Sequence, residues 1–182
     1  MTDENKYIPD LRLGVRLKTI ILLRFIAVIG QLLTIIVVGN ILLFQLPYLE
    51  VYLTIGALVF SNLILFLMYS WNQRLSETTT AIVLAGDIIQ LALLIYFTGG
   101  LSNPFVMLFI VPIAISLDNL PVRSSLVLII LTLISVSILG FYNYPLVQND
   151  MSYLINPNIL TIGIWFSLLV TILFLSLYVG RL

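Results

Sequence analysis

Histidine and cysteine are both absent from the 182 residues of this chain, and only 9% of its residues are charged. Without cysteine, the chain has no disulfide, no thiolate nucleophile and no thiol redox switch. Without histidine it has no imidazole ligand, and its few carboxylates are scattered over different loops, so we expect no metal site. Catalytic triads and phosphate-binding loops are missing as well. We therefore assign no catalytic residue.

Apolar residues dominate what is present, because 61% of the chain is hydrophobic and its mean hydropathy is +1.17. No soluble domain has this composition, which indicates an integral, multi-pass membrane protein surrounded by the lipid bilayer. The formal net charge is zero, so no basic surface favours nucleic acid. Six apolar runs each approach the ~20 residues that cross a ~30 Å hydrocarbon core. We predict an all-α bundle of six transmembrane helices at about 19–44, 49–70, 79–98, 103–119, 122–142 and 158–180.

The distribution of basic residues predicts the orientation of this transmembrane domain, residues 19–182. Lysine and arginine concentrate in the cytoplasmic loops of membrane proteins. All eight fall on one side of the predicted bundle: Lys6, Arg12, Arg16, Lys18, Arg24, Arg74, Arg123 and Arg181. The loops on the other side, at 45–48, 99–102 and 143–157, contain none. Both termini are therefore predicted to be cytoplasmic, with residues 1–18 forming a cytoplasmic N-terminal segment.

Four polar side chains inside the predicted first and third helices are candidates for an intramembrane polar network. Asp87 lies about eight residues into the third helix, where an ionised carboxylate is costly unless it is paired, and Gln90 shares its face. Arg24 and Gln31 share a face of the first helix. Arg24 is either a topology anchor that reaches the interface or the ion-pair partner of Asp87. The network is either a structural clamp or a functional relay.

Small residues recur at four-residue spacing in the sixth apolar run, at Gly163, Ser167 and Thr171. This spacing lets two helices approach closely in lipid. The face they form packs either within the bundle or against a second subunit. We expect the protein to be a homodimer.

Between the third and fourth runs lies the uncharged heptapeptide GGLSNPF, residues 99–105. A glycine just past a helix adopts the left-handed conformation that caps the last carbonyls. Asn103 suits an N-cap, and Pro104 suits the first helical position, where its missing N–H costs nothing. The local pattern therefore predicts a tight corner between two membrane helices, and the charge distribution places this corner at the outer face.

The heptapeptide resembles the GGxxNPF loop of the RegB/PrrB-type redox-sensing histidine kinases, where the loop is associated with ubiquinone binding. Residues 22–31 (LLRFIAVIGQ) resemble the opening helix of that family, and residues 87–94 (DIIQLALL) resemble its third. The resemblance covers roughly residues 12–182, which correspond to the membrane sensor half of these kinases.

This resemblance implies that the chain binds a membrane quinone, either ubiquinone or menaquinone, near its outer face. In that site Gly99 and Gly100 let the backbone approach, Asn103 donates hydrogen bonds, Pro104 begins a helix and Phe105 contacts the ring. It also implies a signal through the sixth helix to a cytoplasmic kinase region and then to a response regulator. Because this chain has no phosphoacceptor histidine and no ATP site, it is either part of such a kinase or a kinase-less relative.

Two other classes stay open on the residues themselves. A small ion- or proton-coupled transporter would use Asp87 and Arg24 as its relay. The lack of a recognisable inverted repeat counts against the common transporter architectures. An inert assembly or scaffold protein is the third possibility.

Overall fold

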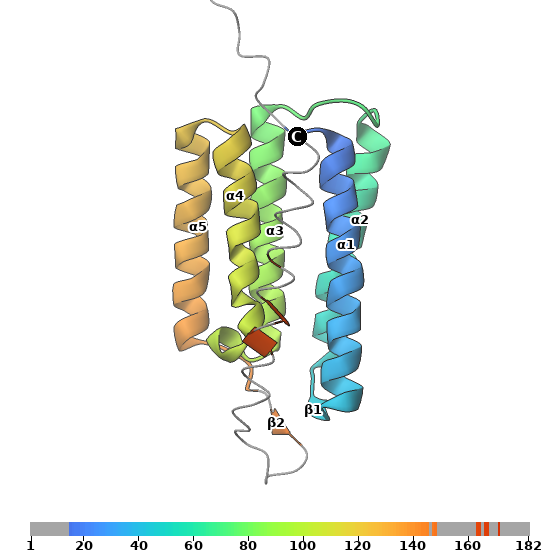
Figure 1. The fold of residues 1–182 in the computed structure, drawn as a ribbon, viewed down its shortest axis with the longest axis vertical. Coiled ribbons are helices and arrows are strands. Elements are labelled where there is room, and N and C mark those ends of the chain that lie inside the picture. The colour runs from blue at the N-terminus through green and yellow to red at the C-terminus, as the bar shows by residue number, and fades with distance from the viewer. Residues whose placement is uncertain (1–14, 146, 149–162, 165, 168–170, 172–182) are drawn as a thin grey trace, which may run out of the picture.

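The structure is a bundle of long helices that run up and down between two ends (Figure 1). It is a computed structural model, and it describes residues 15–145, 147–148, 163–164, 166–167 and 171. Its elements are α1 (Leu17–Ile36), the π-helical turn η1 (Val37–Ile41), β1 (Phe44–Gln45), α2 (Tyr48–Met68), α3 (Glu77–Phe97), the 3-10 helices η2 (Gly100–Ser102) and η3 (Pro104–Phe109), α4 (Ile110–Asn119), α5 (Val122–Phe141) and β2 (Val147–Gln148). The predicted all-helical class is confirmed for this part of the chain.

Four of the described helices are long and apolar enough to cross a membrane: Leu17–Ile41, Tyr48–Met68, Glu77–Phe97 and Val122–Phe141. They coincide with the predicted first, second, third and fifth helices, and no end is shifted by more than three residues. The predicted sixth helix, 158–180, lies outside the described residues except for five, which are all helical: Gly163, Ile164, Phe166, Ser167 and Thr171. The count of six helices and the cytoplasmic termini therefore stay predictions.

The predicted first helix ends earlier than residue 44. It loosens into the π-helical turn at Val37 and stops at Ile41. Leu43 then has φ +56°, in the left-handed region that a right-handed helix cannot continue through. The physical reason for the early end is thus a reversal of the backbone, which apolar composition alone does not reveal.

The fourth apolar run was expected to be one spanning helix over 103–119, and here the structure differs. After the N-cap Asn103, six residues form the 3-10 helix η3 and the last ten form α4, so the run is too short for a regular spanning helix. A 3-10 helix rises about 2.0 Å per residue against about 1.5 Å for an α-helix. The two parts together therefore extend roughly 27 Å, close to the ~30 Å hydrocarbon thickness.

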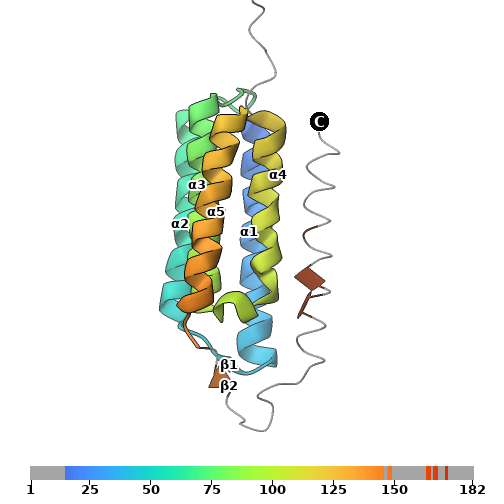
Figure 2. The same cartoon turned by 90° about the vertical axis from the view of Figure 1, so that its left-hand side faces the viewer.

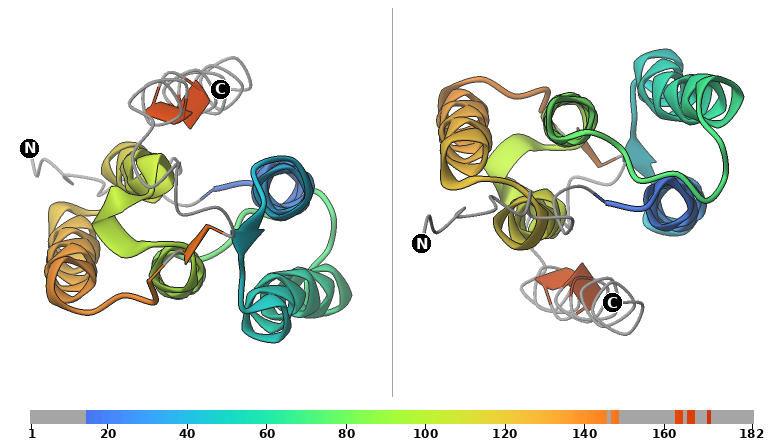
Figure 3. Two further views of the ribbon diagram at one scale, coloured as in Figure 1. Left: turned by 90° about the horizontal axis from the view of Figure 1, so that it is seen from below. Right: turned by 90° about the horizontal axis from the view of Figure 1, so that it is seen from above.

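Seen along its axis, the bundle has α3 in the middle, with α1 and α2 on one side and α4 and α5 on the other (Figure 3). α3 packs directly against α2, α4 and α5, whereas α1 packs against α2. The buried apolar residues form two clusters, one mainly around α3, α4 and α5 with the start of α1, and one mainly around α1 and α2. Because α3 contributes to both clusters, it positions the polar side chains between the two halves.

The two ends of the bundle are closed by different contacts. At one end the N–H of Leu17 donates to the carbonyl of Gln73 at 3.0 Å, so the start of α1 pairs with the α2–α3 loop. At the other end β1 pairs antiparallel with β2, below the turn between α3 and α4 (Figure 2). Arg16, Arg74 and Arg123 all lie at the first end, opposite the 99–105 corner.

Candidate functional site

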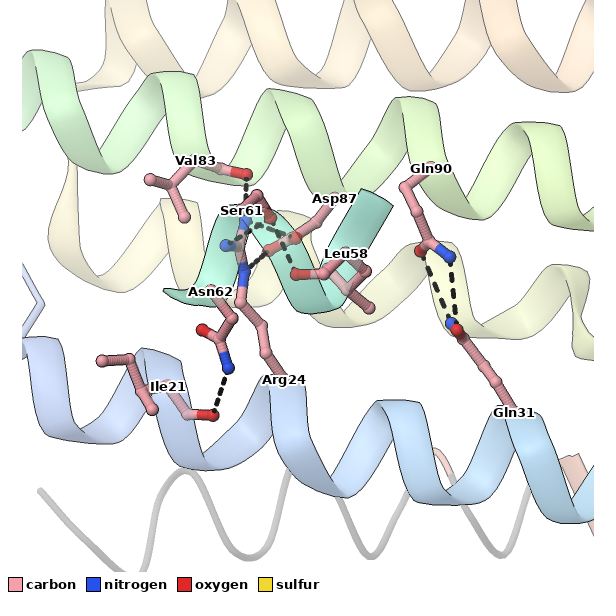
Figure 4. Close-up of polar contacts among 9 residues, drawn as sticks. All are labelled: Ile21, Arg24, Gln31, Leu58, Ser61, Asn62, Val83, Asp87 and Gln90. Atoms are coloured by element: carbon pink, nitrogen blue, oxygen red, sulfur yellow. Dashed lines mark hydrogen bonds and ion pairs between the residues drawn. The ribbon is translucent and has the colours of Figure 1, made fainter. Parts of the chain in front are cut away.

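α3 carries both parts of the candidate site. It begins at Glu77 because Ser76 caps it, with its Oγ accepting the N–H of Thr79 at 3.2 Å. From this start the helix runs unbroken to Phe97 and the glycine corner. Asp87 lies in its middle and faces α1 (Figure 4), so α3 connects the intramembrane polar residues with the corner.

Arg24 of α1 and Asp87 of α3 form an ion pair inside the bundle (Figure 4). Nη2 of Arg24 lies 2.6 Å from Oδ1 of Asp87, and Nε of Arg24 donates to Oδ2 at 3.2 Å. The guanidinium also donates to Oγ of Ser61 at 3.3 Å and to the carbonyl of Val83 at 3.1 Å. Of the two roles open to Arg24, the structure contains the ion pair. The donor fork of arginine holds α1, α2 and α3 together at this depth.

Gln31 and Gln90 form a second contact, one helical turn nearer to the corner along α3 (Figure 4). Nε2 of Gln90 donates to Oε1 of Gln31 at 3.2 Å, and Nε2 of Gln31 donates back to Oε1 of Gln90 at 3.5 Å. No hydrogen bond within the described residues joins this pair to the ion pair. The structure therefore arranges the four predicted residues as two separate rungs between α1 and α3, and we call them the charged rung and the amide rung.

Asn62 of α2 is a further polar residue inside the bundle, beside the four candidate residues. It is buried, and its Nδ2 donates to the carbonyl of Ile21 on α1 at 3.3 Å. An asparagine in the middle of an apolar run indicates such a contact, because a buried amide in lipid requires a partner. Asn62 thus ties α1 to α2 next to the charged rung (Figure 4).

The glycines of the corner have the predicted left-handed conformation. Gly99 has φ +101°, and Gly100 has φ +59°. A Cβ atom at Gly100 would also lie 2.5 Å from Cβ of Asn143, at the end of α5. Glycine at position 100 is therefore required both by the backbone conformation and by the close approach of the neighbouring segment.

Asn103 uses its whole amide group inside the corner. Its Oδ1 accepts the N–H of Phe105 at 2.9 Å, which confirms the predicted N-cap, and Pro104 begins η3 as expected. Its Nδ2 donates to Oγ1 of Thr98 at 2.7 Å and to the carbonyl of Thr98 at 3.2 Å. These bonds use the Asn103 amide to hold the corner closed, and its expected role as a donor to a ligand stays a prediction.

The backbone N–H groups at the start of η3 are used within the corner itself. The N–H of Val106 donates to the carbonyl of Asn103 at 3.1 Å, and that of Phe105 is taken by the N-cap. The N–H groups of Gly100 and Leu101, by contrast, form no hydrogen bond with the described part of the chain. Consecutive N–H groups left available in a turn are the kind of donors that can bind an electron-rich atom.

Three helical residues from the last described part of the chain contact the corner, which the sequence did not predict. Ser167 donates from Oγ to the carbonyl of Pro104 at 2.7 Å. The ring of Phe166 meets that of Phe105 edge-on, with centroids 6.3 Å apart and planes at 83°. A Cβ atom at Gly163 would lie 2.8 Å from Cγ of Pro104. The small-residue spacing predicted a close approach, and these contacts lie within the chain.

Comparisons with known proteins agree with this architecture. The family model described as the PilS-like transmembrane domain matches residues 12–117. The chain is 37% identical over 166 residues to the sensor histidine kinase RegB of Cereibacter sphaeroides, covering 91% of this chain and 36% of the relative. A second sensor histidine kinase RegB, from a defined strain of that species, is 36% identical over 167 residues, covering 92% of this chain and 36% of the relative. No solved structure gives a significant match.

The helical bundle and these relatives define the class as a multi-pass sensor domain of the inner membrane, of the kind found in histidine kinases. More narrowly, the chain belongs to the PilS-like transmembrane domain family, whose model covers more than half of it. The resemblance to RegB-type kinases predicted from the heptapeptide and its flanks is confirmed. The chain spans about a third of the length of the RegB relatives, 36% in both cases.

Proposed function

We propose that this chain is the redox-sensing membrane domain of a two-component histidine kinase, and that the 99–105 corner forms one wall of a membrane quinone site. The observation that carries the proposal is the corner itself, which has the complete GGxxNPF pattern and backbone donors at Gly100 and Leu101 that form no hydrogen bond within the described residues. The ligand is ubiquinone or menaquinone. The likeness to sensor histidine kinases supports the class of the whole protein, which would act as a homodimer on a response regulator.

The chemistry of a quinone fits the groups that the corner leaves available. A quinone is an apolar ring with two carbonyl acceptors, and it requires an apolar slot with a few well-placed donors. The N–H groups of Gly100 and Leu101 supply donors that do not depend on a side chain, and this suits Leu101, which stands at a variable position of the motif. The half-buried ring of Phe105 supplies an aromatic face. Asn103 and Pro104 then position these groups.

Discrimination between redox states follows from the hydrogen-bonding groups of the ligand. The oxidised quinone only accepts hydrogen bonds, whereas the hydroxyl groups of the quinol also donate and need acceptors of their own. A site lined by N–H donors therefore favours the oxidised form. A ligand shifts a conformational equilibrium only by its differential affinity for the two states. The signal would pass through the predicted sixth helix to a cytoplasmic kinase region, with the charged and amide rungs as the fixed frame.

Binding of a short-tailed quinone to the purified chain in lipid nanodiscs tests this proposal. Phe105→Ala should weaken binding about tenfold, because it removes the ring face of the site. Phe60→Ala is the matched control, since Phe60 is an exposed phenylalanine of α2. Asn103→Ser keeps a capping oxygen but loses the bonds to Thr98, and it should weaken binding by a similar factor through loosening of the corner. Equal binding by all four proteins, or none by the parent chain, would contradict the proposal.

A further inference from the structure

Pro104 is the residue at which the corner is contacted by the last described part of the chain. We define the terminal contact set as Gly163, Phe166, Ser167 and Thr171, the described helical residues that lie against the corner or follow the same helical face. Two of its members contact Pro104 and a third contacts the next residue, Phe105. The proposed ligand site and the terminal contact set therefore meet at two consecutive residues.

Ser167 is one of the few hydroxyl groups of this bundle that donate across to a backbone carbonyl of another segment, as Ser125 of α5 does to Ser116 of α4. Serine and threonine in membrane helices commonly donate to the carbonyl four residues earlier in the same helix. That pattern is followed by Thr34, Thr54, Thr132, Ser135, Ser137 and Thr171. Ser167 instead donates across to the carbonyl of Pro104 and is completely buried. Its hydroxyl is thus committed to the corner rather than to its own helix.

The covalent and hydrogen-bond connections of Pro104 join it to the rest of the corner. Its peptide bond to Asn103 is planar, so a displacement of either residue moves the other. Asn103 is held by two hydrogen bonds to Thr98, at the end of α3. The Phe105 ring is half-buried and in edge-on contact with Phe166. A ring that stacks on Phe105 would therefore compete with Phe166 for the same aromatic group.

We infer that the Pro104 contact is the coupling point of the sensor, at which occupation of the corner by oxidised quinone releases the terminal contact set. Ser167 and Gly163 are positioning residues in this scheme: they hold the terminal contact set on Pro104 and do not touch the ligand. This inference rests on the proposed function. It adds to it the residues by which occupancy is passed on, and the direction of the change.

The chain has no cysteine, so a single Thr171→Cys substitution provides a clean probe of the docked state. Thr171 is buried, and its replacement should react slowly with a membrane-permeant maleimide while the contact set is docked. In the ligand-free chain, adding Ser167→Ala or Gly163→Ala should speed this reaction about fivefold or more. Ser137→Ala and Gly56→Ala are the matched controls, because Ser137 is exposed and bonds within its own helix, and a Cβ at Gly56 meets no atom within 4 Å.

Addition of a short-tailed oxidised quinone then tests the coupling. In the Thr171→Cys chain the rate should rise about fivefold or more, and in the Ser167→Ala and Gly163→Ala backgrounds it should change little. The controls should respond as the Thr171→Cys chain does. A rate that quinone leaves unchanged or lowers, in a chain that binds it, overturns the coupling. The coupling is also overturned if quinone raises the maleimide reaction rate in the Ser167→Ala and Gly163→Ala backgrounds as much as in the Thr171→Cys chain alone.

Failure of the proposed function gives a different result. If the parent chain binds no quinone, the ligand site and the coupling are both wrong. The contact of the terminal contact set with Pro104 is tested separately, by the maleimide reaction rates measured without ligand. If Ser167→Ala and Gly163→Ala react no faster than their controls without ligand, the docking contact itself is wrong.

Discussion

The charged rung and the glycine corner both place polar groups inside an apolar bundle, and they satisfy those groups in opposite ways. The charged rung joins side chains 63 residues apart in the sequence and leaves the backbone of both helices intact. The corner interrupts the backbone, and Asn103 satisfies the groups released there by bonds to residues two and five positions away. The rung therefore depends on side-chain chemistry, and the corner depends on backbone conformation.

This difference predicts how each region responds to substitution. Side chains that satisfy only one another are replaceable together, because their joint removal leaves no unpaired group. Backbone groups cannot be removed by substitution. The cost of a side chain at a left-handed position arises from its own backbone conformation, so no second substitution elsewhere removes that cost. A second substitution should accordingly restore most of the stability lost at the charged rung, but only part of the stability lost at the corner.

The largest effect is expected at the charged rung. Asp87→Ala leaves the buried Arg24 without its counter-charge and should destabilise the chain by about 3–5 kcal/mol. Asp87→Asn, which keeps the shape and part of the hydrogen bonding, should cost noticeably less. The pair Arg24→Met with Asp87→Leu should recover most of the loss. Unfolding by titration with sodium dodecyl sulfate in mixed micelles, followed by circular dichroism, measures all four proteins.

If the double variant is as unstable as Asp87→Ala alone, the ion pair is not simply a structural clamp between helices. That result would favour a functional relay at Arg24 and Asp87. Recovery of stability with loss of quinone response would instead show that the pair has a second role beyond holding the helices together.

The second effect concerns Gly100. Gly100→Ala should cost about 1–2 kcal/mol for the left-handed backbone alone, and the collision of the new Cβ with Asn143 adds to this cost. Asn143→Gly in the same chain should relieve the collision and leave the backbone cost. Gly56→Ala, in open space on a helix, should be neutral or slightly stabilising. Full recovery by Asn143→Gly would mean that packing, and not φ, requires the glycine.

The corner was predictable from the sequence to the extent that its hydrogen bonds are local. The left-handed glycines, the Asn103 cap and the start at Pro104 all depend on residues within a few positions, and these predictions hold. The bonds from the Asn103 amide to Thr98 were not predicted, because Thr98 stands at the end of the preceding helix and becomes a partner only when the turn closes.

The contacts between helices were predictable only where charge limits the alternatives. A buried carboxylate needs a cation, and few basic residues lie at the same depth, so Arg24 was a natural partner for Asp87. The bond from Ser167 to Pro104 could not be anticipated, because a serine in a helix has an acceptor within its own helix. The 3-10 winding of η3 is similarly invisible in the sequence, since its six residues are all apolar and carry no periodicity that separates the two windings.

The smallest effect is expected at the amide rung, and it gives the sharpest test of the comparison. Gln31→Leu leaves the buried Gln90 amide without its reciprocal partner, and interhelical hydrogen bonds in membranes contribute about 0.6 kcal/mol on average and up to ~1.7. The cost should lie in this range, because Gln90 keeps a neutral group and no net charge is stranded. Gln31→Leu with Gln90→Leu should recover it, as in the charged rung but on a smaller scale. The same detergent titration, with thermal unfolding as a second measurement, resolves the difference if both variants are compared in one lipid mixture.

If Gln31→Leu costs as much as Asp87→Ala, the two rungs act as one coupled unit, and a double-mutant cycle between Gln31 and Arg24 should then give a non-zero interaction energy. An additive cycle is the expected result, because no hydrogen bond within the described residues connects the amide rung to the charged one.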